Sequence, residues 1–132
     1  MTVFVDTSAL LAVLERRDAN HGSAGEIWHR LITDQVELRT NSYVVAETSA
    51  LVQRRIGMDG ARDLHRVAVP ALSVRFVDAA LHDRAVTALL AAARRSVSLV
   101  DWASFEQMRE ERLGEAFAFD ADFEDQGFRT LR

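Results

Sequence analysis

The chain alternates between short runs of strand-forming residues and longer stretches in which apolar residues recur at helical spacing. Five runs predict strands, at residues 3–5, 36–40, 72–77, 116–119 and 128–131. Helical stretches separate them, at residues 7–17, 20–33, 41–56, 59–69, 78–92 and 101–112, and a short acidic helix or turn covers 121–126. This alternation predicts an α/β fold with a parallel sheet of four or five strands covered by helices.

Cap and turn residues predict several boundaries. Asn41 and Ser42 supply a helix start, and Gly57 is placed as the stop of that helix. Residues 96–100 are interpreted as a short connector, so the next helix is expected to begin at Asp101. The four histidines all fall in helical stretches away from the strand ends, and we interpret them as surface residues. They are His21, His29, His65 and His82.

Composition limits the classes of protein to which the chain can belong. Its 132 residues, 1–132, are most simply one domain, large enough for a hydrophobic core. Cysteine is absent, which excludes disulfides and zinc–thiolate sites. A membrane-spanning helix needs about 20 consecutive apolar residues, and no apolar run in the chain is nearly that long. We therefore expect a cytoplasmic protein with no membrane contact. The net charge of −4 argues against nucleic-acid binding through bulk charge alone.

Four acidic residues stand out by their position. Asp6 and Asp120 each follow a predicted strand, and Asp101 opens a helix on the same side of the sheet. Glu47 lies within an otherwise apolar helical stretch. Ligands bind beyond the carboxyl ends of parallel strands, so these carboxylates can converge on one pocket, although an Asp is also a good helix cap. Spacing alone leaves both interpretations open.

Converging carboxylates would point to a metal site. Several negative charges in one pocket repel one another, and a hard divalent cation removes that repulsion. An all-carboxylate site without His or Cys ligands suits Mg²⁺ or Mn²⁺ rather than Zn²⁺. Water bound to such an ion has a lowered pKa and can attack phosphorus.

Four segments carry a resemblance to a known family. They are residues 4–10 (FVDTSAL), 44–48 (VVAET), 98–105 (SLVDWASF) and 118–123 (AFDADF). In this order, and over nearly the whole chain, they resemble the four acidic blocks of PIN-domain ribonucleases, and most closely the VapC toxins of bacterial toxin–antitoxin pairs. The resemblance implies a three-layer α/β/α fold and a Mg²⁺- or Mn²⁺-dependent endoribonuclease that is the toxin of such a pair.

The resemblance also implies roles for the acidic residues. Asp6, Glu47, Asp101 and Asp120 match the family's catalytic quartet. Asp6 and Asp101 are the first candidates for direct metal ligands, while Glu47 and Asp120 complete the site through waters or a second metal. Asp122 either extends the metal site or belongs with its acidic neighbours to a solvated edge, and we favour the edge.

Three hydroxyl residues are candidates for supporting roles. Thr7 or Ser8 matches the family's hydroxyl position near the first Asp. Ser104 lies three residues after Asp101, on the same side of a helix, where it could orient a carboxylate or a water. It could equally be an ordinary residue of the first helical turn.

The implied reaction is in-line attack of a metal-activated water on an RNA phosphodiester. No histidine pair is placed to use the 2′-hydroxyl instead. The resemblance implies a VapB-like antitoxin that covers the acidic pocket, and a homodimer. An apolar groove near residues 10–14 and 46–52 would suit such a partner. Three arginine pairs are candidates for phosphate contacts, at 16–17, 54–55 and 94–95.

Two other functions are considered. A haloacid-dehalogenase-like phosphatase also begins with a strand that ends in Asp, but it needs a second Asp two residues later, where this chain has Ser8, and a lysine, of which there is none. A catalytically silent PIN module that binds only RNA or a protein is the alternative. An intact acidic quartet argues against it, because such a module has no need for mutually repelling acids. The RNA target stays open.

Overall fold

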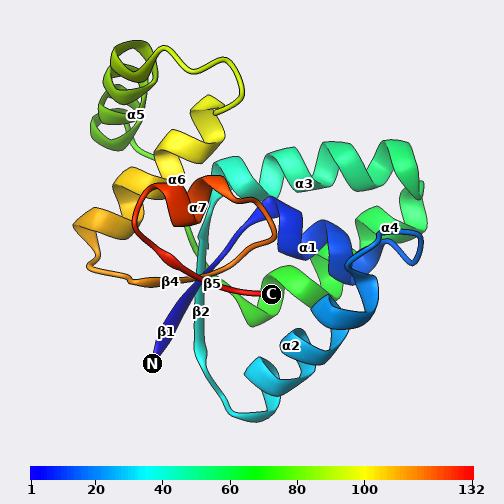
Figure 1. Cartoon of the computed structure of the whole chain (residues 1–132). Coiled ribbons are helices and arrows are strands. Elements are labelled where there is room, and N and C mark those ends of the chain that lie inside the picture. Colours follow the sequence, from blue (N-terminus) through cyan, green and yellow to red (C-terminus); the bar gives the residue numbers. More distant parts are fainter.

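The computed structural model describes all 132 residues and is built around a five-stranded sheet (Figure 1). The strands are β1 (Thr2–Val5), β2 (Glu37–Asn41), β3 (Ser73–Arg75), β4 (Glu115–Phe117) and β5 (Arg129–Leu131). All neighbouring pairs are parallel, in the order β3-β2-β1-β4-β5. The carboxyl ends of the strands therefore share one edge of the sheet, and β1 is central.

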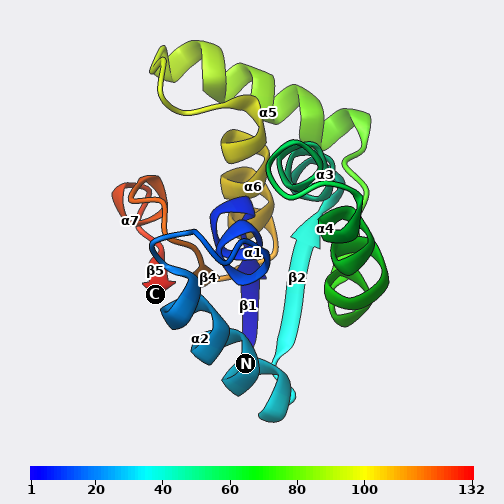
Figure 2. The same cartoon turned by 90° about the vertical axis from the view of Figure 1, so that its right-hand side faces the viewer.

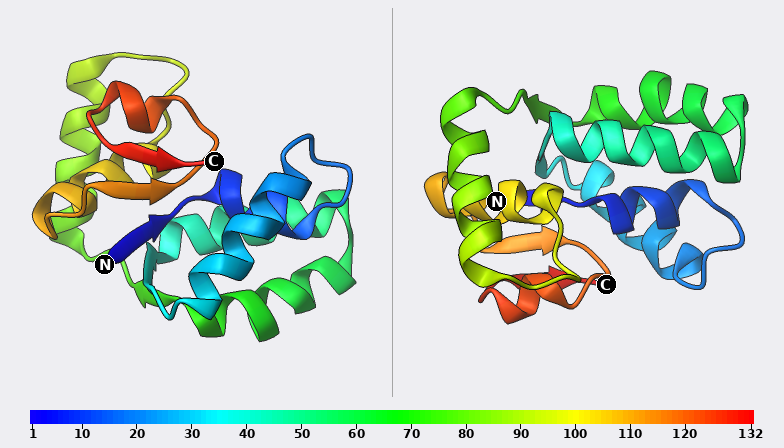
Figure 3. Two further views of the ribbon diagram at one scale, coloured as in Figure 1. Left: turned by 60° about the horizontal axis from the view of Figure 1, so that its bottom comes forward. Right: turned by 90° about the horizontal axis from the view of Figure 1, so that it is seen from above.

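Helices lie on both faces of this sheet. They are α1 (Thr7–Leu14), α2 (His21–Thr33), α3 (Ser42–Arg55), α4 (Met58–Asp63), α5 (Ala79–Ala92), α6 (Leu99–Glu110) and α7 (Asp122–Asp125). Helices α1 to α4 lie on one side of the strands, and α5 and α6 lie on the other (Figure 1). Figure 3 shows α5 at the opposite end of the molecule from α4. The predicted α/β/α architecture with a parallel sheet is confirmed.

The core joins the central strand to both helical layers. Val3, Phe4 and Val5 of β1 are fully buried. On the α6 side, the ring of Phe105 meets that of Phe123 edge-on at 4.9 Å between centroids, and Phe123 lies 6.3 Å from Phe4. None of the helices combines the length and the apolar character that a membrane crossing requires.

Helix α6 begins earlier than the sequence predicts. Residues 96–100 are not all connector, because Ser98 is the N-cap and Leu99 is already helical. The Ser98 hydroxyl accepts the Asp101 N–H at 3.2 Å, and the Asp101 carboxylate accepts the Ser98 N–H at 2.9 Å. This reciprocal capping box satisfies two N–H groups that the helix leaves free, and it places Asp101 in the first turn rather than at the helix start.

Two other predicted helices differ from the structure, one in its length and one in its type of helical turn. The first ends at Leu14 rather than residue 17, and the Asp18 carboxylate accepts the Asn20 N–H at 2.8 Å to form a turn. The helix predicted over 59–69 consists of α4, a π-helical turn (Leu64–Ala68) and a 3₁₀ turn (Val69–Ala71). Pro70 lies in the 3₁₀ turn, and because it has no N–H it cannot continue an α-helix.

Strand β4 ends at Phe117, two residues before the predicted end. The N–H of Phe119 bonds the hydroxyl of Ser8 at 2.9 Å rather than a neighbouring strand. The chain therefore leaves the sheet before Asp120 and turns toward the start of α1. Figure 2 shows the arrangement at this edge, where β1 and β2 run side by side and α1 and α3 follow their ends.

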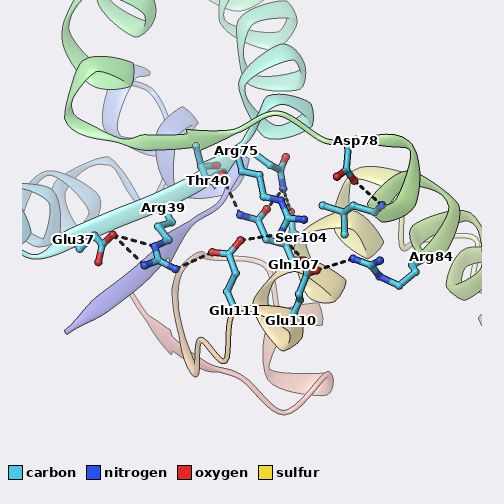
Figure 4. Close-up of polar contacts among 12 residues, drawn as sticks. Glu37, Arg39, Thr40, Arg75, Asp78, Arg84, Ser104, Gln107, Glu110 and Glu111 are labelled. Carbon is cyan, nitrogen blue, oxygen red and sulfur yellow. Dashed lines mark hydrogen bonds and ion pairs between the residues drawn. The ribbon is translucent and has the colours of Figure 1, made fainter.

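A buried polar network joins the ends of the central strands to α6 (Figure 4). The Thr40 hydroxyl donates to the Val5 carbonyl at 2.8 Å, and the Gln107 amide donates to the Thr40 carbonyl at 3.3 Å. The Asn41 amide donates in turn to Gln107 Oε1 at 3.0 Å and, at 3.3 Å, to Ser104 Oγ. Thr40, Asn41, Ser104 and Gln107 are all fully buried, so these bonds lie out of water and fix the elements relative to one another.

An ionic cluster covers the outer end of the same interface. Arg39 and Arg75, on adjacent strands, both bond the carboxylate of Glu111, at 3.0 and 3.1 Å. Glu110 pairs with Arg75 and also with Arg84 of α5 (Figure 4). These side chains are partly exposed, so each pair contributes little alone, but together they tie the carboxyl end of α6 to β2, β3 and α5.

The network predicts that Gln107→Leu destabilises the protein. Leucine fills a similar volume but leaves the Thr40 carbonyl and the Asn41 amide without their buried partner, at a cost of about 2–4 kcal/mol in the free energy of unfolding. Urea unfolding measures this loss. The matched control is Gln53→Leu on exposed α3 surface, which is expected to change the free energy of unfolding by less than about 0.5 kcal/mol. Equal losses in both variants would contradict the assignment.

Candidate metal centre

Asp6 directly follows the central strand and is the N-cap of α1. One carboxylate oxygen, Oδ2, accepts the Ser8 N–H at 3.1 Å and the Ser8 hydroxyl at 2.7 Å. Only 3% of the residue is exposed. The capping interpretation and the site interpretation are therefore compatible, because the cap uses one oxygen and leaves the other, Oδ1, without a protein hydrogen bond.

Ser8, rather than Thr7, is the hydroxyl that contacts the first carboxylate. Its Oγ donates to Asp6 and accepts the N–H of Phe119. The hydroxyl thus joins the end of β1 to the segment that carries Asp120. Thr7 is buried, and its Oγ1 accepts from the hydroxyl of Thr48 on α3 at 3.3 Å.

Three further carboxylates meet at the same edge of the sheet. Asp101, Asp120 and Asp122 each place an oxygen within 4.8 Å of the others. Asp101 comes from the first turn of α6, whereas the other two come from the segment after β4. The N–H of Asp122 bonds Asp120 Oδ1 at 2.9 Å, which folds this segment into a turn and directs both side chains to one place.

The expectation that Asp122 belongs to a solvated edge is wrong. Its side chain is only 17% exposed, and it lies with Asp101 and Asp120 rather than pointing into solvent with Glu124 and Asp125. The two-residue spacing from Asp120 was the available signal. An Asp that accepts the N–H two residues later makes a compact turn, and such a turn keeps the residue at i+2 close to the carboxylate.

The electrostatics of the pocket are those of crowded, poorly hydrated carboxylates. Burial raises the pKa of Asp6 to about 7, and Asp101 and Asp120 add to the rise while the Ser8 bonds oppose it. Burial also raises the pKa of Asp101 to about 6, with further contributions from Asp120 and Glu47. Burial and the neighbouring Asp120 raise the pKa of Asp122. Without a cation, Asp6, Asp101 and Asp122 therefore keep their protons to a higher pH than carboxyl groups in water do.

Glu47 approaches this group from the wall of the pocket. It is half-buried on α3, and it faces the first turn of α6 beside Leu99 and Val100. Its charge is among the causes that raise the pKa of Asp101. The structure thus brings the four predicted acids, Asp6, Glu47, Asp101 and Asp120, to one edge of the sheet and adds Asp122.

Ser104 and two histidines depart from their expected surroundings. Ser104 is fully buried, and its hydroxyl accepts a hydrogen bond from the Asn41 amide. Its side chain therefore belongs to the buried polar network rather than to the carboxylates. His21 and His82 are half-buried rather than surface residues. His21 Nδ1 lies 2.8 Å from the Ala12 carbonyl, and His82 Nδ1 bonds the Tyr43 hydroxyl.

Arg94 is the one basic side chain that pairs with any of these five acids. Its guanidinium lies 3.8 Å from Asp122 at the rim of the pocket. Arg55 of another predicted pair bonds Glu15 at 3.4 Å, on the side of α3 toward α1. Among the arginine pairs, therefore, the one at 94–95 is placed to meet a phosphate that approaches the carboxylates.

The donor set fits a hard divalent cation. Every side chain that converges on the pocket offers carboxylate oxygen, the type of ligand that Mg²⁺ and Mn²⁺ prefer. Asp101, Asp120 and Asp122 are close enough to share one ion, and Asp6 and Glu47 stand beside them. A cation would also lower these pKa values, which burial and the neighbouring carboxylates raise, because an opposite charge favours the ionised form.

The chain resembles known proteins over nearly its whole length. The PIN domain family matches residues 3–129. The 23S rRNA-specific endonuclease VapC20 of Mycobacterium tuberculosis is 35% identical over an alignment of 138 positions, which covers 98% of each chain. A crystal structure of VapC20, described as a sarcin–ricin loop cleaving toxin, aligns with a TM-score of 0.84 at 34% identity, over 96% of this chain and 95% of that one.

A second solved structure supports the fold alone. FitAcB from Neisseria gonorrhoeae aligns with a TM-score of 0.70 over all of this chain and 97% of that one, at 13% sequence identity.

The raised pKa of Asp6 predicts how stability changes with pH. In EDTA, the folded protein keeps a proton on Asp6 up to about pH 7, whereas the unfolded chain loses it near pH 4. The folded state therefore binds more protons in this window, so the free energy of unfolding falls as pH rises from about 4 to 7. Between pH 5 and 8 we expect a loss of about 2–3 kcal/mol in urea unfolding.

Asp6→Asn is the control for this prediction. Asparagine keeps an acceptor oxygen for Ser8 but cannot ionise, so the part of the pH dependence that comes from Asp6 should disappear, while the part from Asp101 and Asp122 remains. Millimolar Mn²⁺ should raise the melting temperature of the wild-type protein more at pH 8 than at pH 5, and should do so less in the variant. A stability of the metal-free wild type that rises from pH 5 to 8 would refute this account of the pocket.

Proposed function

Since the chain belongs to the PIN-domain family, and within it to the VapC endonucleases, we propose that it is a ribonuclease toxin whose catalytic residues are the acids of the pocket. The observation that supports this most strongly is the convergence of Asp101, Asp120 and Asp122 beside the buried Asp6. We propose Asp6, Glu47, Asp101 and Asp120 as the catalytic quartet, with Asp122 as a fifth acid of the site. Residues 1–132 would form one domain.

The position of each residue suggests its role in the proposed reaction. Asp101, Asp120 and Asp122 would hold Mg²⁺ or Mn²⁺ together with Asp6, and Glu47 would complete the site from α3. When bound, the ion supplies positive charge to the phosphodiester and lowers the pKa of the attacking water. Ser8 orients the Asp6 carboxylate through two hydrogen bonds, and the Ser98 capping box orients Asp101. Arg94 would meet a phosphate oxygen at the rim.

The proposed substrate is a structured loop of ribosomal RNA. VapC20, a relative of similar length, supports this proposal. It is named as a 23S rRNA-specific endonuclease and described as a toxin that cleaves the sarcin–ricin loop. A loop suits this acidic protein, because unpaired bases can be recognised by shape and stacking rather than by bulk positive charge. The chain then needs few cations, and the divalent ion supplies positive charge where the phosphate binds.

A VapB-like antitoxin is the proposed protein partner, and a homodimer the proposed oligomer. The structure offers two separate apolar hollows rather than the single groove that the sequence predicts. Val13 and Leu14 line a pocket of about 220 Å³ beside α2. Val45, Val69 and Phe76 belong to a larger groove of about 720 Å³ along α3. Residues 10–12 are buried in the core, which is why the two hollows do not join.

Cleavage of bacterial 23S rRNA in intact ribosomes tests the proposal. The purified chain, free of antitoxin, should cut in Mg²⁺ or Mn²⁺ and not in EDTA. Asp101→Asn removes one charge from the pocket and should lower kcat/KM by at least about 100-fold. Asp34→Asn, an equivalent change on exposed surface, should leave it unchanged. Cutting that persists in EDTA and in Asp101→Asn would refute the metal–carboxylate mechanism.

Arg94→Ala should weaken substrate binding without removing the chemistry. We expect KM to rise by about 5–20-fold while kcat changes little. The slope of log KM against log salt concentration should fall by about the amount that the loss of one phosphate contact produces. Arg30→Ala on α2 is the control, since this exposed residue lies away from the pocket. An unchanged KM and salt slope in Arg94→Ala would show that Arg94 serves only as a partner of Asp122.

A further inference from the structure

A shallow apolar notch lies beside the acidic pocket, between α3 and the first turn of α6. Its volume is about 410 Å³, and four of its five lining residues are apolar. They are Tyr43, Ala46, Leu99 and Val100, and the fifth is Glu47. We call this hollow the notch. It is separate from the larger groove along α3, although Ala46 borders both.

The notch lies next to the acidic pocket. Glu47 lines the notch, and its charge acts on Asp101. Val100 directly precedes Asp101 in the first turn of α6. A phosphate held beside Asp101 would therefore lie close to the notch, because Val100 lines the notch and directly precedes Asp101. A nucleoside attached to that phosphate toward α3 would then be within reach of the notch.

The walls of the notch are fixed before any ligand arrives. The Tyr43 hydroxyl bonds His82 on α5, and the two rings meet edge-on at 6.0 Å between centroids. Leu99 and Val100 are half-buried and held by the capping box that starts α6. The notch is open to solvent on the side of Ala46, because the methyl group of this exposed residue is small. A rigid aromatic and aliphatic surface of this kind suits a flat apolar ligand.

We propose that the notch binds the nucleobase next to the phosphate that is cut. This subsite rests on the proposed ribonuclease function. Unpaired bases that are turned out of a loop bind on aromatic and apolar side chains. The Tyr43 hydroxyl is engaged by His82, and the Glu47 carboxylate faces Asp101. The rest of the lining is apolar, so the notch would bind the flat face of an unpaired base and show little preference for which base it is.

A base fits the notch better than a protein segment does. An amphipathic helix needs a row of anchors over several turns, and the larger groove with Val45, Val69 and Phe76 provides such a row on the same helix. The notch spans only one turn of α3, from Tyr43 to Glu47, and the first turn of α6.

A pair of variants and a pair of RNAs test the subsite. Ala46→Trp fills the notch from an exposed position, so the fold should tolerate it. Ala50→Trp adds the same ring one turn further along α3, where it borders only the larger groove. The substrate is a sarcin–ricin loop hairpin of 23S rRNA, intact or with an abasic nucleotide on either side of the cut. Cleavage in Mn²⁺ and the Mn²⁺-dependent rise in melting temperature are both measured.

The subsite predicts a specific pattern. An abasic nucleotide on one side of the cut should lower kcat/KM of the wild type by about 10–100-fold, whereas exchanging that base for another should change it by less than about threefold. Ala46→Trp should show a similar loss on intact RNA and no further loss on abasic RNA, with an unchanged Mn²⁺ response. Ala50→Trp should behave as the wild type.

Other patterns overturn the subsite. If Ala46→Trp cuts as well as the wild type, or still loses activity on abasic RNA, no base occupies the notch. If both tryptophan variants lose activity equally, α3 contacts a protein or a second copy instead. If the wild type cuts no RNA, the proposed function fails, and hairpin binding by Asp101→Asn, read by fluorescence anisotropy, decides the subsite. Equal affinity for intact and abasic hairpins, or no binding, rejects it.

Discussion

Negative charges that are brought together and partly removed from water determine much of this structure. Asp6 is almost fully buried, and Asp101, Asp120 and Asp122 lie within a few ångströms of one another with a single arginine at the rim. Each carboxylate raises the free energy of its neighbours' ionised forms, so the pocket opposes its own assembly. Elements that carry these residues must therefore be held by contacts elsewhere in the fold.

Those contacts lie directly beneath and beside the pocket. The Thr40 hydroxyl bonds the carbonyl of Val5, the residue before Asp6, and Gln107 bonds the Thr40 carbonyl from α6. Asn41 caps the helix that carries Glu47 and bonds Gln107 with its amide. The acid-bearing elements β1, α3 and α6 are thus joined by buried neutral hydrogen bonds, which do not depend on the protonation of the carboxylates.

Sequence patterns predicted the parts of the site that depend on element ends. Asp6 and Asp120 follow strands, and in a parallel sheet such residues share an edge, which the adjacency of β1 and β4 satisfies. The position of Asp122 depended on a turn made by the Asp120 side chain, and that of Ser104 on which face of α6 meets β2. For Asp122 the two-residue spacing permits such a turn without requiring it, and for Ser104 helical spacing does not say which neighbour the buried face meets. Gln107 gave no signal at all, because a polar residue in a helix usually faces solvent.

The link between Ser8 and Phe119 joins residues 111 positions apart in the sequence, and β1 and β4 pair over a similar separation. During synthesis the first strand therefore leaves the ribosome long before β4, one of its two partner strands, exists. No partial chain that lacks residues 101–122 can gather the carboxylates, whatever helices it has already formed. The acidic pocket is consequently assembled only after the last part of the domain has emerged from the ribosome and docked beside β1.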